Sequence, residues 1–434
     1  MFQEISESER HDAANVIEAK TMELLMRMPD KLKEINSKSK QQAKVLETLI
    51  MWAAIIVTIL HGSTCLKDVW RLVVNGVWGT CKVKISEQAI YKRAGGKAWE
   101  TMREIFLYFS EKMHGWYNDP FLDKFTFARN IFALDDSVLD KIAKKHGTFE
   151  NTKKGEPVLA GRITSLYDIR SGQFRKVEFK ENARQNEKIA GWEFLEEIPE
   201  KSLLLFDLGY FSFRWFDELK DKGLFYISRL REKTSFKCIH VFLDTDSVKD
   251  CLVWLGKHRA DRAKHAVRMV RVKYRNQYFT YITDIINPRE LSAGDILKLY
   301  GLRWNIEIAF RFIKQILSLK VIWCCNLEAI KLQIYATLIV AQMHRAVRRE
   351  IAIRAGVPED YVSDLLLPRI MQQILMHTNA KDPIKLILES HKNLGLIRKP
   401  RRVVYQTPEI DQSKILPLPE NTVLVRVPRY AGKM

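Results

Sequence analysis

The sequence lacks the cysteine patterns of zinc-binding and disulfide-stapled proteins. Its six cysteines include no Cys-x-x-Cys pair, and none lies in a Cys/His cluster with the spacing of a zinc site. Scattered, reduced thiols are typical of the cytosol, so we expect a cytoplasmic protein. The sequence also has no internal repeat and no low-complexity segment, and its 434 residues suffice for two or three domains with a large core.

Apolar runs long enough to cross a bilayer are missing as well. Residues 49–60 form an apolar run of twelve residues that includes one Thr, whereas a membrane-spanning helix needs about 20 residues. We therefore interpret this run as a buried helix. Residues 1–20 are polar and include acidic side chains, so we expect neither a signal peptide nor a membrane partner.

Acidic residues are scarcer than basic ones. The chain has 52 Asp and Glu against 71 Lys and Arg, which gives a formal net charge of +19 and a pI near 9.5. This balance favours a polyanionic partner, and nucleic acid is the commonest one, although a merely basic soluble protein would have the same composition. The basic residues are dense in four stretches, as in a long electrostatic footprint: residues 141–188, 259–275, 398–402 and 426–433.

The most informative stretch is residues 300–314. Four polar side chains recur there at steps of three, four and seven residues, which return to one face of an α-helix: Tyr300, Arg303, Glu307 and Lys314. An apolar stripe follows a neighbouring face: Leu299, Leu302, Ile306, Ala309, Ile313 and Ile316. Ser292, with Asp295 three residues on, predicts the N-cap at the start of this helix. One carboxylate among two cations and a phenol suits a site that holds a metal ion and a phosphodiester together. The alternative is an ordinary amphipathic helix with an Arg303–Glu307 surface pair worth a few tenths of a kcal/mol.

Further carboxylates follow apolar strands upstream. Residues 202–206 read as an apolar strand that leads into Asp207, and residues 131–134 lead into Asp135 and Asp136. A carboxylate at the end of a buried strand costs free energy unless it meets a cation or a metal ion. The pattern predicts strands at 159–169, 174–179, 202–206 and 225–230 and helices at 184–195 and 212–222. That order is the one expected of an RNase H-like α/β core with a mixed sheet.

The pattern Tyr-x2-Arg-x3-Glu-x6-Lys at residues 300–314 resembles the signature of the insertion-sequence-four family of transposases, which are DDE enzymes on an RNase H-like fold. The Arg-Trp-x-x-Glu core and the Asp-x-Gly-Tyr turn that begins at Asp207 extend the match. The resemblance covers roughly residues 40–350 and is strongest in three short blocks.

The resemblance implies three regions. Residues 1–118 would be a helical DNA-binding region, and residues 119–350 an RNase H-like catalytic domain with a β-rich insertion at about 232–285. Residues 351–434 would be a helical C-terminal region with a Pro-rich basic tail. Within the first region Ser86 is a plausible N-cap for a helix that resembles the second helix of a helix-turn-helix, and its candidate DNA contacts are Gln88, Tyr91, Lys92 and Arg93. A surface helix in a small bundle is the alternative.

The resemblance also implies the site and its cofactor. Asp135, Asp207 and Glu307 would be both the catalytic residues and the metal ligands, and would hold two Mg²⁺ ions about 4 Å apart, with Mn²⁺ as the alternative metal. Tyr300, Arg303 and Lys314 would grip phosphates near the cleaved end and support a DNA hairpin intermediate. A flipped base would need an aromatic platform, and the sequence does not choose between Trp254 and Tyr278.

The first aspartate is open to two interpretations. Neighbouring side chains on a strand point to opposite faces, so only one of Asp135 and Asp136 can readily meet Asp207. The family usually has Asp-Gly-Ser or Asp-Gly-Thr at this place. Aligning Ser137 puts Asp135 in the catalytic position and Asp136 where glycine is usual.

The sequence thus predicts a DNA transposase that cleaves the ends of its insertion sequence and joins them to target DNA. Its partners would be double-stranded DNA, in the form of terminal inverted repeats and target, and a second copy of the chain in a homodimer. Its place would be the cytoplasm, in association with the nucleoid. Two alternatives remain: an inactive relative that only binds DNA, and a metal-dependent nuclease without strand transfer.

Overall fold

The computed structural model describes residues 48–63, 65–75, 83–114, 120–139, 161–183, 187–257, 261–274, 277–324, 326–371, 383–399 and 410–430. Part of the helical region predicted at residues 1–118 lies outside them, including residues 1–47.

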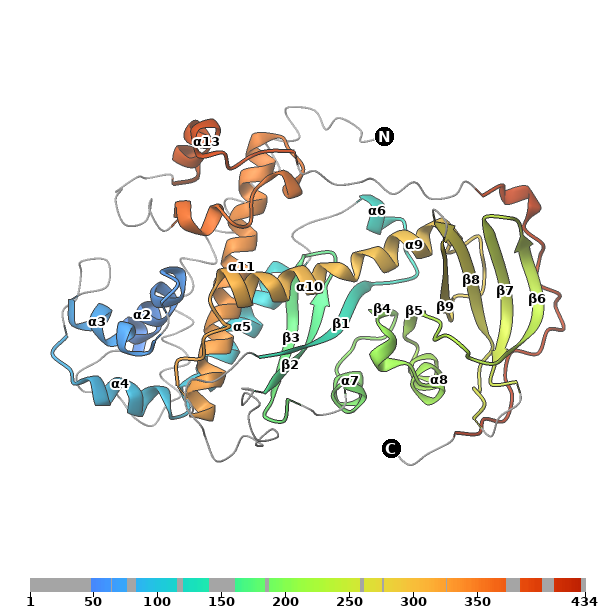
Figure 1. Ribbon diagram of the computed structural model, residues 1–434, viewed down its shortest axis with the longest axis horizontal. Coiled ribbons are helices and arrows are strands. Elements are labelled where there is room, and N and C mark those ends of the chain that lie inside the picture. Colours follow the sequence, from blue (N-terminus) through green and yellow to red (C-terminus); the bar gives the residue numbers. More distant parts are fainter. Residues whose placement is uncertain are drawn as a thin grey trace.

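In the described part of the chain, nine strands form one mixed sheet in the order β3-β2-β1-β4-β5-β9-β8-β7-β6 (Figure 1). The strands are β1 (Asn130–Val138), β2 (Arg162–Asp168), β3 (Gln173–Lys180), β4 (Ser202–Phe206), β5 (Phe225–Arg229), β6 (Phe236–Asp244), β7 (Val248–Leu255), β8 (Val267–Tyr274) and β9 (Gln277–Thr283). Strands β1, β4 and β5 are parallel, and every other neighbouring pair is antiparallel.

The helices lie mostly before and after the sheet strands in the sequence. They are α2 (Thr48–Leu60), α3 (Lys67–Asn75), α4 (Glu87–Ala94), α5 (Ala98–Met113), α6 (Pro120–Asp123), α7 (Glu187–Leu195), α8 (Phe213–Asp221), α9 (Ala293–Leu302), α10 (Trp304–Arg311), α11 (Leu327–Ala355) and α13 (Pro383–Leu394). The order β1-β2-β3-α7-β4-α8-β5, followed by a later helix, confirms the order of elements predicted from the sequence.

Alternation along the central strands separates two helical layers. Ile131 and Ala133 of β1 belong to the core that includes α9, α10 and α11, whereas Phe132 and Leu134 belong to the core that includes α7 and α8. Figure 1 shows α9 and α10 running across one side of the sheet, with α7 and α8 on the other. The sheet is therefore covered on both faces, which explains why β2 and β4 are buried along their whole length.

Strand β1 extends further than the sequence predicts. The predicted strand ends at Leu134, where the parallel partner β4 also ends, since the last β1–β4 pair is Leu134 with Phe206. Its antiparallel partner β2 continues as far as the pairing of Val138 with Arg162. Asp135 and Asp136 therefore lie within β1 rather than after it, so the pairing with β2 fixes the opposite directions of their side chains.

The N-terminal helices share the core of the sheet. Helix α2 is the buried helix predicted for residues 49–60, and its side chains belong to the same apolar cluster as α5, α11 and one face of β1. Helix α11 contacts both α2 and α5. Removing residues 46–118 would therefore strip apolar surface from the core, so their role is better tested by single surface substitutions.

The predicted β-rich segment extends the central sheet. Strands β6 to β9 pair antiparallel in sequence order, and β9 returns to pair with β5. The C-terminal tail crosses this sheet: the Leu416 N–H donates to the Phe242 carbonyl at 2.9 Å, and the Ala266 N–H donates to the Leu424 carbonyl at 2.8 Å. The Tyr430 hydroxyl, further along the tail, donates to Asp217 of α8 at 2.8 Å.

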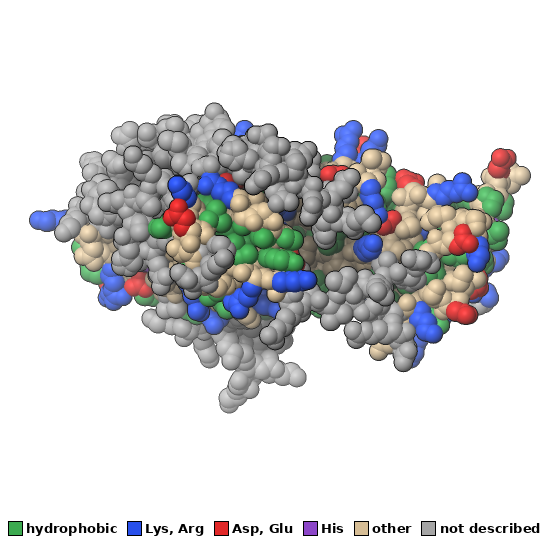
Figure 2. All heavy atoms as spheres, turned by 90° about the horizontal axis from the view of Figure 1, so that it is seen from above, with side chains coloured by type: hydrophobic (Ala, Val, Ile, Leu, Met, Phe, Trp, Pro, Cys, Tyr) green, Lys and Arg blue, Asp and Glu red, His purple; other side chains and the backbone are tan. Residues whose placement is uncertain are grey.

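The helices and the surface bear on two expectations from the composition, namely the absence of a membrane-spanning segment and the basic surface. Among the described helices, none is both long and apolar enough to cross a bilayer. Seen from above, Lys and Arg side chains border an apolar area and recur along the described surface (Figure 2).

Candidate active site

Asp135 and Asp207 lie side by side at the edge of the parallel strands. Each is the next residue after the last β1–β4 pair, Leu134 with Phe206. By alternation Asp135 shares a face with Ala133, which packs in the core of α9 and α10, and α10 contacts β1. The first two predicted carboxylates therefore lie on neighbouring chain segments just past the end of the parallel pairing, near the helix that carries the third.

The predicted signature helix is interrupted, which corrects the expectation of one continuous helix. Helix α9 begins at its predicted N-cap, where the Ser292 hydroxyl accepts a hydrogen bond from the Asp295 N–H at 3.1 Å. The N–H groups of Arg303 and Ile306 bond to carbonyls three residues back, at 3.1 and 3.2 Å, so the chain tightens between α9 and α10. Residues Phe312–Ile316 then widen into a π-helix.

The π-helix directs Lys314 back to the end of β1. Its ammonium group donates to the Val138 carbonyl at 2.8 Å and lies 3.4 Å from the Ser137 hydroxyl. Short π-helical turns occur often at functional sites, because they change the direction of side chains on one helical face. Lys314 thus stays on the side of the carboxylates although the helix that carries it is irregular.

Arg303 links the first and third carboxylates. Its guanidinium donates to Glu307 at 2.7 Å and lies 3.5 Å from an Asp135 oxygen. The Arg303 side chain is only 8% exposed, against 30% for Glu307. The pair is therefore a half-buried part of the site, not the exposed surface pair considered as the alternative.

The carboxylates share one electrostatic environment. The pKa of Asp135 is raised to about 7, chiefly by burial and also by the negative charges of Asp207 and Glu307. The N–H of Asp136, which donates to Asp135 at 2.8 Å, and the nearby Arg303 guanidinium lower it. A carboxylate that is this hard to ionise indicates a site that favours an additional cation.

No three His, Cys, Asp or Glu side chains of the described residues are gathered closely enough to hold a metal ion. Asp135 and Glu307 are joined through the Arg303 guanidinium instead. The oxygen-only donor set fits Mg²⁺ or Mn²⁺ in its chemistry. A bound metal ion would compete with the guanidinium for the same oxygens.

Tyr300 lies beside this group, and a further arginine was missed by the sequence reasoning. Burial raises the pKa of Tyr300 to about 12, so the phenol keeps its proton near neutral pH. Arg229 ends β5 and shares the face of Asp135 by alternation, since Ile227 belongs to the same core. The guanidinium of Arg229 stacks over Phe279, 5.5 Å from the ring centre. The strand predicted at 225–230 could have identified Arg229, because parallel strands end at a common edge and Arg229 lies at the end of this strand.

Asp136 points to the other face. Its carboxylate accepts a hydrogen bond from the Tyr210 hydroxyl at 3.0 Å and pairs with Arg162 at 3.2 Å. Of the two adjacent aspartates, the structure places Asp135 on the side of Asp207, Arg303 and Glu307.

The predicted DNA-contacting helix lies elsewhere. Helix α4 begins at its predicted N-cap, where the Ser86 hydroxyl accepts from the Ala89 N–H at 3.3 Å. Gln88, Tyr91 and Lys92 are exposed, and Arg93 is half-buried. Figure 1 shows α4 at the opposite end of the molecule from β6 and β7. The structure therefore does not bring these four side chains to the carboxylates.

The two candidate aromatic platforms differ in exposure. Tyr278 is 47% exposed, with the Arg271 guanidinium 4.3 Å from its ring centre. Trp254 is half-buried, and Arg426 of the C-terminal tail stacks over it at 4.6 Å.

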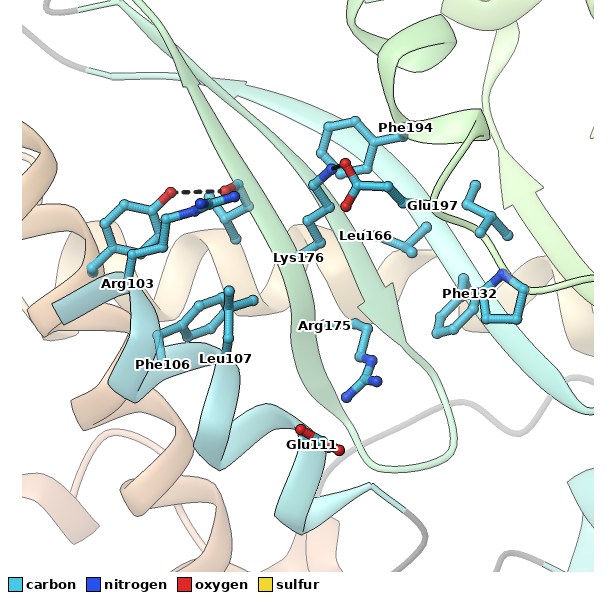
Figure 3. A pocket seen from close by; sticks show the side chains of 14 residues that line it. Arg103, Phe106, Leu107, Glu111, Phe132, Leu166, Arg175, Lys176, Phe194 and Glu197 are labelled. Carbon is cyan, nitrogen blue, oxygen red and sulfur yellow. Dashed lines mark hydrogen bonds and ion pairs between the residues drawn. The ribbon is translucent and has the colours of Figure 1, made fainter. Parts of the chain in front are cut away.

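A hollow in the described part of the chain lies apart from the carboxylates. It has a volume of about 250 Å³ and lies between α5, β3 and α7. Figure 3 shows Lys176 between Phe194 and Glu197, with Phe132 further along the same wall. Phe132 lies on the face of β1 opposite to Asp135, so this hollow is not part of the candidate active site.

Two aspartates just past the last β1–β4 pair and a glutamate on α10, with Arg303 between the first and the third, are the class of arrangement expected of a DDE enzyme on a mixed α/β sheet. Residues 127–343, half of the chain, match the family described as "Transposase DDE domain", and this range contains all three carboxylates. The chain belongs to this family of transposases, of the insertion-sequence-four type.

Individual relatives agree with this assignment. The chain is 27% identical over 159 residues to "Putative transposase y4zB" of Sinorhizobium fredii, which covers 35% of this chain and 44% of the relative. It is 27% identical over 214 residues to "Transposase for insertion sequence element IS231D" of Bacillus thuringiensis subsp. finitimus, which covers 49% of this chain and 42% of the relative. The chain thus spans less than half the length of these relatives.

One solved structure aligns with most of the chain. The cryo-EM structure of the piggyBac transposase synaptic complex with hairpin DNA aligns with 87% of this chain and 84% of that chain, at 9% sequence identity and a TM-score of 0.41.

Proposed function

We propose that the chain is a DNA transposase that cleaves the ends of its own insertion sequence and joins them to target DNA. The observation that carries this proposal is the electrostatic coupling of Asp135 to Asp207 and Glu307, which are far from it in the sequence. The site lies inside the transposase DDE domain. The net charge of +19 suits a DNA partner.

Asp135, Asp207 and Glu307 would hold divalent metal ions, with Mg²⁺ favoured by the all-oxygen donors and Mn²⁺ as the alternative. Two such ions, when bound, would activate the attacking water or 3′-hydroxyl and stabilise the leaving oxygen. The carboxylates of this chain would position that chemistry in line with the phosphodiester bond.

The cationic residues would hold the DNA backbone. The Nε atom of Arg303 is buried and has no hydrogen-bond partner among the described residues. If a metal ion displaced the guanidinium from Glu307, its planar fork would be free to donate to a phosphate oxygen. Tyr300 remains a neutral donor, and Lys314 supplies a point charge at the end of β1. Arg229 would extend this phosphate-binding row towards the inserted strands.

Tyr278 is the better candidate for the base-stacking platform. Its ring is exposed and flanked by Arg271, whereas the tail arginine Arg426 already stacks on Trp254. Aromatic rings with adjacent cations stack nucleic-acid bases without sequence preference.

The helical region would recognise the element ends. Gln88, Tyr91, Lys92 and Arg93 would contact terminal inverted repeats from α4, within a DNA-binding region of residues 1–118. Residues 119–350 would form the catalytic domain, and residues 351–434 the C-terminal region. A homodimer would bring two ends together, in the cytoplasm at the nucleoid.

One cleavage assay separates this function from its two alternatives. The purified chain is incubated with labelled duplexes taken from both flanks of its gene, with Mg²⁺ or with EDTA, and with a supercoiled target plasmid. A transposase yields Mg²⁺-dependent cuts at the element boundary and joined products. Binding without cuts indicates an inactive relative, and cuts without joined products indicate a nuclease; either result contradicts the proposal.

Substitutions on α4 are expected to weaken preference for the element ends. Gln88→Ala and Tyr91→Ala remove exposed side chains of a helix whose buried side includes Ile90, so the fold should persist. Loss of a base contact typically reduces discrimination by about 5-fold to 150-fold. Competition between end duplex and scrambled duplex measures this ratio, with Lys112→Ala on the exposed face of α5 as the control. Unchanged preference in both variants would show that α4 does not read the ends.

A further inference from the structure

Asp136 stands where the resembled family usually has glycine, and its surroundings are specialised for a carboxylate. The side chain is fully buried, and its two oxygens have different partners. One accepts a hydrogen bond from the Tyr210 hydroxyl at 3.0 Å. The other lies 3.2 Å from Nε of Arg162, whose side chain is 9% exposed. A buried carboxylate needs such partners, because without them its desolvation would be costly.

Tyr210 connects Asp136 to the turn that carries Asp207. Asp207 and Tyr210 belong to the same Asp-x-Gly-Tyr turn. In this turn the Asp207 carboxylate accepts a hydrogen bond from the Gly209 N–H at 2.8 Å. The Tyr210 ring is buried and lies 6.0 Å from the Phe206 ring and 6.1 Å from the Trp215 ring, measured between centres. A Cβ atom added at Gly191 would lie 2.8 Å from the Tyr210 ring, so α7 also closes over it. The phenol therefore has little freedom to leave Asp136.

The same residue also holds Asp135 through its backbone. The Asp136 N–H donates to the Asp135 carboxylate at 2.8 Å. Asp136 thus touches the first carboxylate with its main chain, on one face of the sheet, and the turn of the second carboxylate with its side chain, on the other face. Arg162, on the neighbouring strand β2, neutralises the charge that this arrangement introduces.

We propose that Asp136, Tyr210 and Arg162 form a buried tether that fixes Asp135 and Asp207 relative to each other. Asp136 is a positioning residue, since it faces away from Arg303 and Glu307 and touches no reacting group. The tether would raise the affinity of the two aspartates for a divalent metal ion. This consequence rests on the proposed function, in which Asp135 and Asp207 are metal ligands. Groups that orient metal ligands typically change metal affinity or activity by about 10-fold to 100-fold when they are removed.

Tyr210→Phe tests the tether with the smallest change. It removes only the hydroxyl that reaches Asp136 and leaves the buried ring. Tyr226→Phe is the matched control, because Tyr226 is buried in the same apolar cluster and its hydroxyl has no hydrogen-bond partner among the described residues. Both variants are made in the full chain, and Mn²⁺ binding without DNA is measured by electron paramagnetic resonance, together with thermal unfolding.

Tyr210→Phe is expected to weaken Mn²⁺ binding about tenfold relative to Tyr226→Phe, with similar unfolding temperatures. Nicking by Tyr210→Phe should fall at low Mg²⁺ and recover at high Mg²⁺, because the ligands are displaced and not lost. Equal Mn²⁺ affinity in the two variants would overturn the tether. A fall in nicking that high Mg²⁺ does not restore would do the same.

Variants of Asp136 provide a second, independent readout. Asp136→Asn keeps the shape but removes the charge that faces Arg162, and Asp136→Gly introduces the usual family residue. Each should weaken Mn²⁺ binding about as much as Tyr210→Phe does. The double variant Asp136→Gly with Tyr210→Phe should lose little more Mn²⁺ affinity than the weaker-binding single variant, since both changes break the contact between Asp136 and Tyr210. If the losses of Mn²⁺ affinity in the two single variants multiplied in the double variant, the two residues would act independently, and the tether would be refuted.

The outcomes also separate this inference from the proposed function. If the wild type binds Mn²⁺ but never cuts element ends, and Tyr210→Phe still weakens binding, the tether stands and transposition fails. If the wild type cuts and joins DNA while Tyr210→Phe equals Tyr226→Phe throughout, transposition stands and the tether fails.

Discussion

Asp207→Asn and Glu307→Gln are each expected to lower nicking of the element ends by about a thousandfold or more, while affinity for those ends stays within about threefold of wild type. Each substitution replaces an anionic ligand by a neutral amide of the same shape. DNA binding should persist, because the phosphate contacts are assigned to cations, and those are retained. Gel assays of nicked product and anisotropy of end binding measure the two quantities on the same preparations.

Exposed acidic residues provide the controls. Asp246→Asn lies in the turn between β6 and β7, and Glu290→Gln lies before α9; both side chains are exposed. These variants remove the same charge without touching the carboxylate site, so they should nick like the wild type. If Asp207→Asn or Glu307→Gln nicked at the control rate in Mg²⁺, that carboxylate would not be a ligand.

Arg303→Ala is expected to slow the steps after the first nick about 100-fold while it reduces the first nick far less. Arg303 binds no metal ion, yet its guanidinium lies between Asp135 and Glu307 and has a buried Nε atom without a partner among the described residues. In the proposed function it would hold the DNA strand that bends back into a hairpin after the first cut. Tyr300→Phe should have a similar but smaller effect. Time courses that resolve nicked, hairpin and released products show where each variant stalls.

Two variants define the specificity of that result. Arg311→Ala removes an exposed arginine at the end of the same helix α10 and should follow the wild-type time course. Arg303→Lys keeps the charge but loses the planar fork, so it should stall where Arg303→Ala does. Equal loss at the first nick and at later steps would contradict this division of labour.

Much of the fold followed from periodicity. The alternating and apolar runs predicted the strands on either side of Asp207, and the stripe from Leu299 to Ile316 predicted the buried face of the signature helix. The Ser86 and Ser292 caps were also confirmed. These features depend on residues close in sequence, whose conformational preferences can be predicted without knowledge of tertiary contacts.

Other features depend on contacts between distant segments. Gly301 lies two residues before the break at Arg303, but a single Gly does not predict a break, and no Gly or Pro lies in the π-helix at Phe312–Ile316. Arg229 joins the site only because β5 is parallel to β4. The hydrogen bond between Asp136 and Tyr210 joins residues 74 positions apart in the sequence. The sequence therefore identified Asp135 and Asp136 as alternatives but did not explain why a second carboxylate is tolerated there.

Anomalous diffraction from crystals of the full chain bound to an element-end duplex in Mn²⁺ would locate the metal ions. We predict manganese peaks in contact with carboxylate oxygens of Asp135, Asp207 and Glu307, with the Arg303 guanidinium moved from Glu307 towards a phosphate. Manganese bound to Asp136, or at a place that touches none of these three carboxylates, would contradict the proposed active site.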